Sequence, residues 1–127
     1  MFISPVRAQP LTEELAALQA DAKVSEEQRR IPAADEVPAP AFPGSRFCFH
    51  SSSGFFHTVL LLSMAPYQEV KAWYKEKLRW ICVPYNEKDE QFNCISGSDT
   101  VSIQKATSSK ACELDGLQTL IGIQYAK

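Results

Sequence analysis

Two histidines, His50 and His57, are the residues whose type and spacing come nearest to a chemical site in this chain. They flank a predicted turn, and a hairpin centred on Ser53-Gly54 would place the two side chains directly opposite each other. Such neighbours have Cβ atoms about 5 Å apart, so two imidazoles could hold a transition metal or respond to pH near about 6.5. A catalytic zinc needs three protein ligands, and the fold would have to supply a third, such as Asp99 or Glu113. We therefore expect a surface pair without metal or cofactor, and we keep a small metal-binding protein or enzyme as the alternative.

The other polar clusters predict solvent-exposed structure rather than catalysis. The serines at 51–53 adjoin the histidines, but an activated serine needs a base held by a third group, and serines are common in turns. The basic side chains between residues 71 and 79 could form an anion site, although a solvated helix face is the favoured interpretation. The acidic run at 87–90 lacks the spacing of a calcium loop. Motifs such as G-x-S-x-G, G-x-G-x-x-G and H-E-x-x-H are missing, so we expect no catalytic residues and a non-enzymatic protein.

Four cysteines are an unusual number for a chain of 127 residues. None of them forms a C-x-x-C motif, so neither a zinc knuckle nor a thioredoxin-like redox site is predicted. An even number of cysteines fits two disulfides in an oxidising compartment, whereas four buried thiols would fit a cytosolic core. Val6 and Ala8 match the small residues that precede a secretory cleavage site, so residues 1–8 are either a signal-peptide remnant or a terminus that resembles one by chance. We expect a periplasmic or secreted protein.

The pairing of the cysteines can be argued from the alternation of side chains along strands. If Trp80 and Phe92 face the core, then Cys82 and Cys94 point to the same side of neighbouring strands. Cys48 and Cys112 would then form the second disulfide. The two other connectivities, 48–82 with 94–112 and 48–94 with 82–112, stay open because sequence alone does not fix pairing.

Length, charge and composition predict a single soluble domain. The chain has a mass of 14.2 kDa, is 45% hydrophobic and carries a formal net charge of −2 with a pI near 5.7. That balance argues against nucleic acid as a partner, because such proteins are usually basic. No apolar run approaches the roughly 20 residues of a membrane span.

The chain divides into an N-terminal helical arm at 9–30, a proline-rich linker at 31–44 and a folded domain at 45–127. Leu11, Leu15, Leu18 and Ala22 recur at helical spacing and form a narrow apolar stripe. Four of the eight prolines fall within the linker and favour an extended path.

The domain at 45–127 is predicted as α+β, an antiparallel sheet with one packed helix. Strands are expected at 46–51, 56–63, 80–84, 92–95, 100–105 and 117–125, and a helix is expected from about 65 to 78. Residues 59–62 are apolar on both faces, which indicates an interior strand. On the last strand, Leu117, Thr119, Ile121, Ile123 and Tyr125 are expected to share one face.

This layout resembles small uncharacterised exported bacterial domains with the pattern P-G … V-x-x-[FW]-Y-x-x-x-L … T-x-I-x-I. The matching residues lie between about 37 and 125 and include Val70, Trp73, Tyr74, Leu78 and the strand that contains Thr119. The resemblance implies an accessory or binding domain of the cell envelope and brings no catalytic residues with it. We therefore expect a non-enzymatic exported domain that binds a protein or an envelope component. Residues 9–30 would be the contact to that partner or to a second copy.

Overall fold

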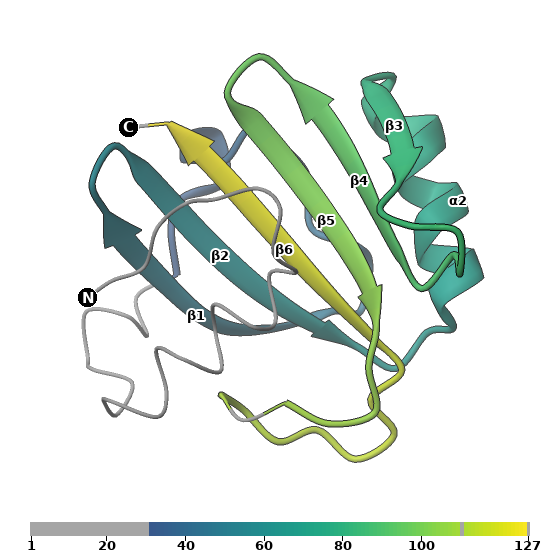
Figure 1. Ribbon diagram of the computed structural model, residues 1–127. Helices are drawn as coiled ribbons and strands as arrows, with labels where there is room; N and C mark the ends of the chain where they lie inside the picture. Colours follow the sequence, from purple (N-terminus) through teal and green to yellow (C-terminus); the bar gives the residue numbers. More distant parts are fainter. Residues whose placement is uncertain (1–30, 110, 127) are drawn as a thin grey trace.

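The computed structural model describes residues 31–109 and 111–126 (Figure 1). Both the arm predicted at 9–30 and the signal-peptide remnant predicted at 1–8 lie outside the described residues. Six antiparallel strands form one sheet in the order β1-β2-β6-β5-β4-β3. The elements are η2 (Ala34–Glu36), β1 (Arg46–Ser53), β2 (Phe56–Ser63), α2 (Tyr67–Leu78), β3 (Ile81–Pro84), β4 (Gln91–Ser96), β5 (Asp99–Lys105) and β6 (Thr119–Ala126). The predicted α+β architecture, a sheet with one packed helix, is confirmed for this part of the chain.

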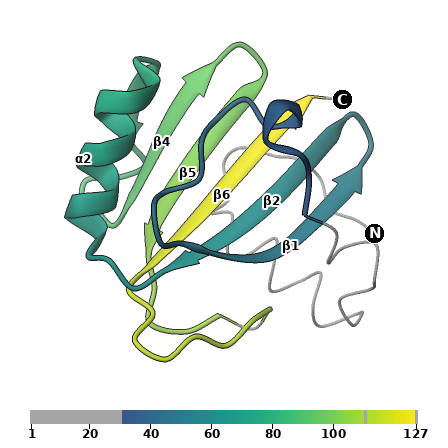
Figure 2. The same ribbon diagram turned by 180° about the vertical axis from the view of Figure 1, so that it is seen from behind.

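Helix α2 lies across one side of the sheet, here called the helix face (Figure 2). The helix follows Pro66 and ends at Leu78, and the next residue, Arg79, adopts a left-handed conformation with φ of 56°. Val70 and Tyr74 are fully buried against the sheet, and Trp73 and Leu78 are partly buried beside them, as their spacing predicted.

The segment predicted as an extended linker contains the short helix η2, and it packs on the helix face next to α2 (Figure 2). Its apolar side chains lie between the prolines, and Ala39 and Phe42 belong to the main hydrophobic cluster. The Phe42 ring meets the Trp73 ring edge to face at 5.3 Å, and the Tyr74 hydroxyl donates a hydrogen bond of 2.8 Å to the Pro40 carbonyl. Residues 32–44 therefore complete the cover of the helix face, which a proline-rich composition alone does not indicate.

The opposite side of the sheet, here called the loop face, carries a second hydrophobic cluster. Residues 106–109 and 111–118, here called the covering loop, extend beyond the lower ends of the strands in Figure 1, and their apolar side chains pack against β1, β2 and β6 on this face. The disulfide between Cys48 and Cys112 ties this loop to β1. Leu117 packs in this second cluster with Leu60 and Leu120. Our prediction that it shares a face with Ile121 was wrong, because β6 begins only at Thr119.

The β1–β2 hairpin differs in register from the prediction. Its two central residues are Gly54 and Phe55, and Gly54 has φ of +59°, which suits glycine at the first central position of a type II′ turn. His50 therefore lies opposite Val59, and His57 lies opposite Ser52. The expectation that the histidines face each other directly was wrong, because the turn is centred one residue later than we assumed.

Candidate functional site

The two histidines nevertheless meet on the helix face, as diagonal neighbours. His50 Nε2 lies 3.0 Å from His57 Nδ1, within hydrogen-bond distance. His50 is buried, and the half-buried ring of His57 stacks on Tyr125 with centroids 5.0 Å apart. The pair is thus packed into the body of the protein rather than placed on its surface.

A metal ion would have to replace the hydrogen bond between the two rings, because neutral imidazole offers one acceptor nitrogen. Within residues 31–109 and 111–126, no group of three or more His, Cys, Asp or Glu side chains could hold a metal. Asp99 begins β5 and Glu113 lies in the covering loop, and neither joins the histidines in such a group. Metal binding by His50 and His57 stays the untested alternative to the metal-free pair that the sequence predicted.

The acidic run at 87–90 contains one residue with a defined structural role. Asp89, at φ of 52°, accepts hydrogen bonds from Tyr67 Oη at 3.0 Å, Gln68 Nε2 at 3.1 Å and Lys71 Nζ at 2.8 Å. The Lys71 bond, followed by the Gln68 bond, lowers the pKa of Asp89 to about 2. The loop between β3 and β4 is thereby joined to α2, a contact that no local sequence pattern predicts.

The basic side chains of α2 lie over aromatic rings. Lys71 Nζ is 4.9 Å from the centre of the Phe92 ring, and Lys75 Nζ is 5.8 Å from it. Lys77 Nζ lies 5.8 Å from the centre of the Trp73 ring. Lys71 is only 19% exposed, so it belongs to the packing between helix and sheet and not to a solvent stripe.

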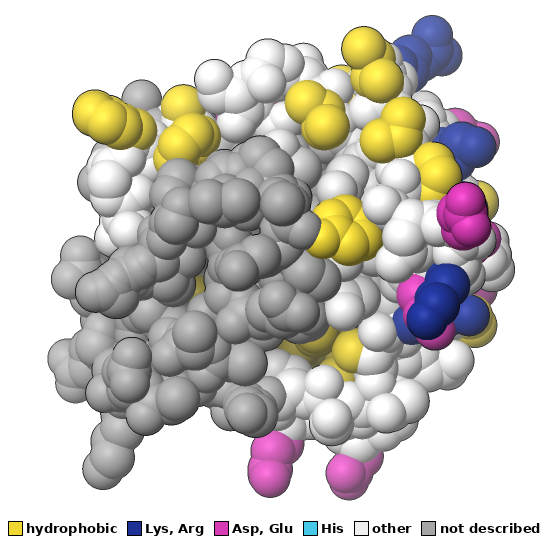
Figure 3. Space-filling model, in the orientation of Figure 1, with side chains coloured by type: hydrophobic (Ala, Val, Ile, Leu, Met, Phe, Trp, Pro, Cys, Tyr) yellow, Lys and Arg dark blue, Asp and Glu magenta, His cyan; other side chains and the backbone are white. Residues whose placement is uncertain are grey.

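Three aliphatic side chains on the loop face are exposed, and they lie next to one another on β3 and β4. Ile81 is 74% exposed, Val83 44% and Ile95 41%, and Ile81 is directly opposite Ile95 in the ladder. We call these three residues the β3 strip. Figure 3 shows apolar side chains gathered over β3 and β4 on this face. The alternation of Ile81 and Val83 with Cys82 indicates in the sequence that the two side chains share a face, but it does not indicate that this face is uncovered.

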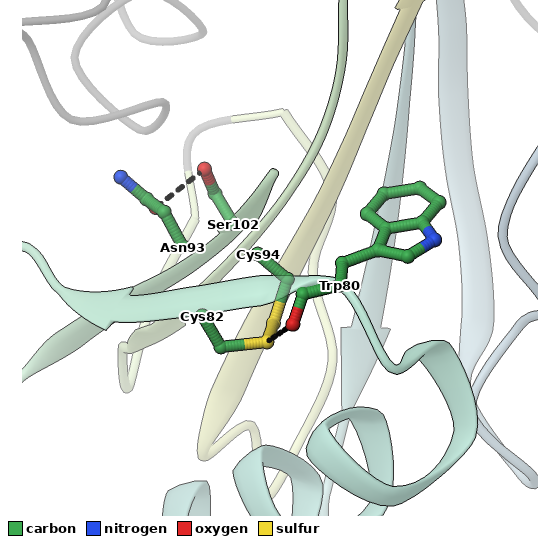
Figure 4. Close-up of a disulfide and its surroundings, with 5 residues drawn as sticks. All are labelled: Trp80, Cys82, Asn93, Cys94 and Ser102. Atoms are coloured by element: carbon green, nitrogen blue, oxygen red, sulfur yellow. Dashed lines mark hydrogen bonds between the residues drawn. A yellow bond between two sulfur atoms is a disulfide. The ribbon is translucent and has the colours of Figure 1, made fainter. Parts of the chain in front are cut away.

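The disulfide between Cys82 and Cys94 lies on the other side of the same two strands (Figure 4). Both predicted disulfides, 82–94 and 48–112, are present. Asn93 points away from the disulfide and accepts a hydrogen bond of 2.8 Å from the Ser102 hydroxyl. The strip thus has a covalent cross-link beneath it and a hydrogen-bonded polar pair beside it.

The outer edge of β3 is poorly suited to pairing with a further strand. The Tyr85 N–H donates to the Gln91 carbonyl at 2.8 Å, so alternate residues back along β3, Val83 and Ile81, also direct their N–H groups toward β4. Cys82 and Pro84 therefore turn their backbone groups outward, and proline has no N–H to offer. A partner at this site has to contact the side chains of the strip rather than extend the sheet.

No helix in the described part of the chain is long and apolar enough to cross a membrane. A scan against protein-family models and searches of curated proteins and of solved structures give no match for this chain. The resemblance to small exported bacterial domains therefore stays a prediction based on sequence pattern.

Proposed function

We propose that this protein is a non-enzymatic exported bacterial domain that binds another protein or a component of the cell envelope through the β3 strip. The observation that carries the proposal is the exposure of Ile81, Val83 and Ile95 as one contiguous apolar surface. Single exposed apolar residues are normal in soluble proteins, but adjacent ones on a sheet face are typical of interaction sites.

The disulfide and the hydrogen bonds that hold β3 and β4 in place favour recognition of a partner. Cys82 and Cys94 have Cα atoms 4.0 Å apart, and their disulfide fixes the two strands that carry the strip. Asp89 holds the loop between these strands to α2. A surface held in one conformation loses little conformational entropy on binding, so even a small apolar contact can contribute to affinity.

The proposed location rests on the disulfides. Two disulfides and no free cysteine among the described residues fit an oxidising compartment, such as the periplasm or the extracellular space. The proposal also includes a contribution of residues 9–30 to partner binding. That segment lies outside the described residues, so this part rests on the sequence alone.

The proposal can be tested by capture from envelope extract with a matched pair of variants. The bait is the full chain, as wild type, as Ile81→Asp and as Phe55→Asp. Phe55 is 83% exposed at the tip of the β1–β2 hairpin, so it provides an equally exposed control away from the strip. We expect one or more partners bound by the wild type and Phe55→Asp and reduced about tenfold or more with Ile81→Asp, since burial of an Ile side chain contributes more than one decade of affinity. Equal capture by all three baits, or no partner at all, would contradict the proposal.

A further inference from the structure

The part of the loop face formed by β3 to β6, all of whose residues the structure describes, carries no charged side chain. Side chains alternate along a strand, so Ile81, Val83 and Ile95 share this face with every second residue of β4, β5 and β6. Figure 3 shows charged side chains at the right and lower margins of the face, with apolar and uncharged ones between them. The half-buried neighbours of the β3 strip are amides and hydroxyls: Asn93, Thr100, Ser102, Gln104 and Gln124.

This composition narrows the class of partner. Phosphate groups and anionic lipids are bound by lysine and arginine, and neither lies on this face of β3 to β6. Stable complexes between proteins bury about 800 Å² on each partner and depend on anchors such as tryptophan and arginine, whereas the strip has three aliphatic side chains. Amides and hydroxyls together donate and accept hydrogen bonds, as the hydroxyl and amide groups of a neutral saccharide do. A chain of repeating sugars also gains affinity from repetition, so each unit needs only a small contact.

One row of side chains across the ladder combines these groups. Val83 lies directly opposite Asn93, and Asn93 lies directly opposite Ser102. The Asn93 Oδ1 atom accepts hydrogen bonds from Ser102 Oγ at 2.8 Å and from Gln91 Nε2 at 3.4 Å, which fixes the amide. Its Nδ2 atom points away from Ser102 (Figure 4) and donates to no described residue. The row therefore presents a fixed N–H donor between the methyl groups of Val83 and a hydroxyl.

We propose that this row binds the N-acetyl group of a neutral polysaccharide of the cell envelope. The acetamido carbonyl accepts the hydrogen bond from Asn93 Nδ2, its methyl group contacts Val83, and a ring hydroxyl donates to Ser102 Oγ. Opposite residues have Cβ atoms about 5 Å apart, and the carbonyl oxygen and the methyl group share one carbon, so both contacts form together. Ile81 and Ile95 contact the C–H groups of the next sugar ring. The inference rests on the proposed function and names the class of envelope component that the β3 strip binds.

Titration of the full chain with an oligosaccharide of N-acetylglucosamine tests the inference. The matched ligand is the glucose oligosaccharide of the same length and linkage, which has hydroxyls in place of the acetamido groups. We expect the acetylated ligand to bind at least about tenfold more tightly in isothermal titration calorimetry, because the glucose ligand leaves Asn93 Nδ2 and Val83 without their contacts. In NMR spectra of the isotope-labelled chain, the largest amide shift changes should occur in β3, β4 and β5. No binding of the acetylated ligand, equal binding of the two ligands, or shift changes confined to other elements would overturn the inference.

A pair of variants of equal size and charge change tests the role of Asn93. Asn93→Asp keeps an oxygen that accepts from Ser102 and replaces the Nδ2 donor with a negatively charged acceptor, which repels the acetamido carbonyl. We expect this variant to bind the acetylated ligand about tenfold more weakly or worse. The control, Asn86→Asp, makes the same change in the β3–β4 loop, where Asn86 Oδ1 accepts from the Lys88 N–H at 3.0 Å, and should leave binding unchanged. Full affinity in Asn93→Asp, or equal loss in both variants, would refute the role given to Asn93 Nδ2.

The inference and the proposed function can fail separately. If the acetylated ligand does not bind but Ile81→Asp still reduces the capture of a protein from envelope extract, the inference is wrong and the proposed function stands. If the acetylated ligand does not bind and nothing captured from the extract depends on Ile81, both are wrong.

Discussion

The two faces of the sheet are covered in different ways. On the helix face, α2 and residues 32–44 pack with buried side chains of β2, β4, β5 and β6 in one hydrophobic cluster that contains Tyr74, Phe92 and Ile121. On the loop face, the covering loop protects a smaller cluster over β1, β2 and β6, whereas the β3 strip at the other edge is exposed. The helix face is therefore buried by α2 and residues 32–44, whereas the loop face is buried only in part, by a loop that a disulfide holds in place.

The covering loop shows why a cross-link is needed on the loop face. It contains no helix or strand in its described residues. The backbone hydrogen bonds at its ends run from the Ala106 N–H to Gln118 and from the Gln118 N–H to Ser63 of β2, whereas those from the Leu117 N–H to Leu114 and from the Ala111 N–H to the Ser109 side chain stay within the loop. Little in the backbone holds the middle of the loop on the sheet. The Cys48–Cys112 disulfide holds it there and keeps Leu60 and Leu62 out of water.

The largest expected effect comes from removing that disulfide. Its cysteines are 64 residues apart, and those of Cys82–Cys94 only 12, which in the chain-entropy model correspond to about 4 and about 3 kcal/mol of stability. We expect Cys48→Ala with Cys112→Ala to lower the free energy of unfolding by about 4 kcal/mol and to increase hydrogen exchange in β1 and β2. Urea unfolding followed by tryptophan fluorescence measures the first effect, and mass spectrometry measures the second.

The matched control is Cys82→Ala with Cys94→Ala, which removes a bridge between strands that the ladder already pairs. This variant should lose less stability and leave exchange in β1 and β2 unchanged. If both double variants lost the same stability and exposed the same segments, the distinction between the two faces would not hold.

The next largest effect is expected on the helix face. Phe42 is buried among residues of α2 and the sheet, so Phe42→Ala should lower the free energy of unfolding by about 3 kcal/mol. Phe55→Ala, at a residue that is 83% exposed, should change it by less than about 0.5 kcal/mol. A Phe42→Ala protein as stable as the control would mean that residues 32–44 contribute no packing energy to this face.

Most of the fold could be predicted because its signals are local. The period-two pattern of Val101 and Ile103, the helical spacing of Val70 and Tyr74, and the parity of Cys82 and Cys94 each depend on neighbours in sequence. These patterns predicted the six strands, helix α2 and the disulfide between Cys82 and Cys94, which left Cys48 and Cys112 as the favoured second pair. The register of the β1–β2 hairpin was missed because four consecutive small or turn-forming residues, 51–54, allow more than one turn position.

The candidate surface was harder to predict because it depends on which part of the sheet the covering loop protects. Ile81 and Val83 are ordinary strand residues in sequence, and they are exposed because the covering loop packs against β1, β2 and β6 and not against β3 and β4. The packing of Phe42 likewise depends on how residues 32–44 cross the sheet, which proline content does not determine. The hydrogen bonds to Asp89 join residues about 20 positions apart, beyond the range of any local pattern.

A smaller effect should separate packing from hydrogen bonding on the helix face. Tyr74 is fully buried and its hydroxyl bonds to the Pro40 carbonyl at 2.8 Å, so Tyr74→Phe keeps the ring and removes one hydrogen bond. We expect a loss of about 1 kcal/mol in the free energy of unfolding, measured by urea denaturation. A loss as large as that of Phe42→Ala would show that this bond, rather than the apolar contacts, fixes residues 32–44 to α2.

The smallest effect is expected at Asp89, which joins the β3–β4 loop to the helix face from an exposed position. Its pKa is lowered to about 2, chiefly by the Lys71 hydrogen bond, so the unfolded chain binds the proton more readily than the folded one. The stabilisation is complete above the unfolded value near 3.8 and declines as the pH falls toward 2. Asparagine also tolerates the left-handed backbone found at this position, so Asp89→Asn removes the titrating carboxylate and keeps the backbone conformation. The difference in urea midpoint between the wild type and this variant should therefore shrink between pH 4 and pH 2, and a constant difference would show that the carboxylate does not contribute to holding the loop.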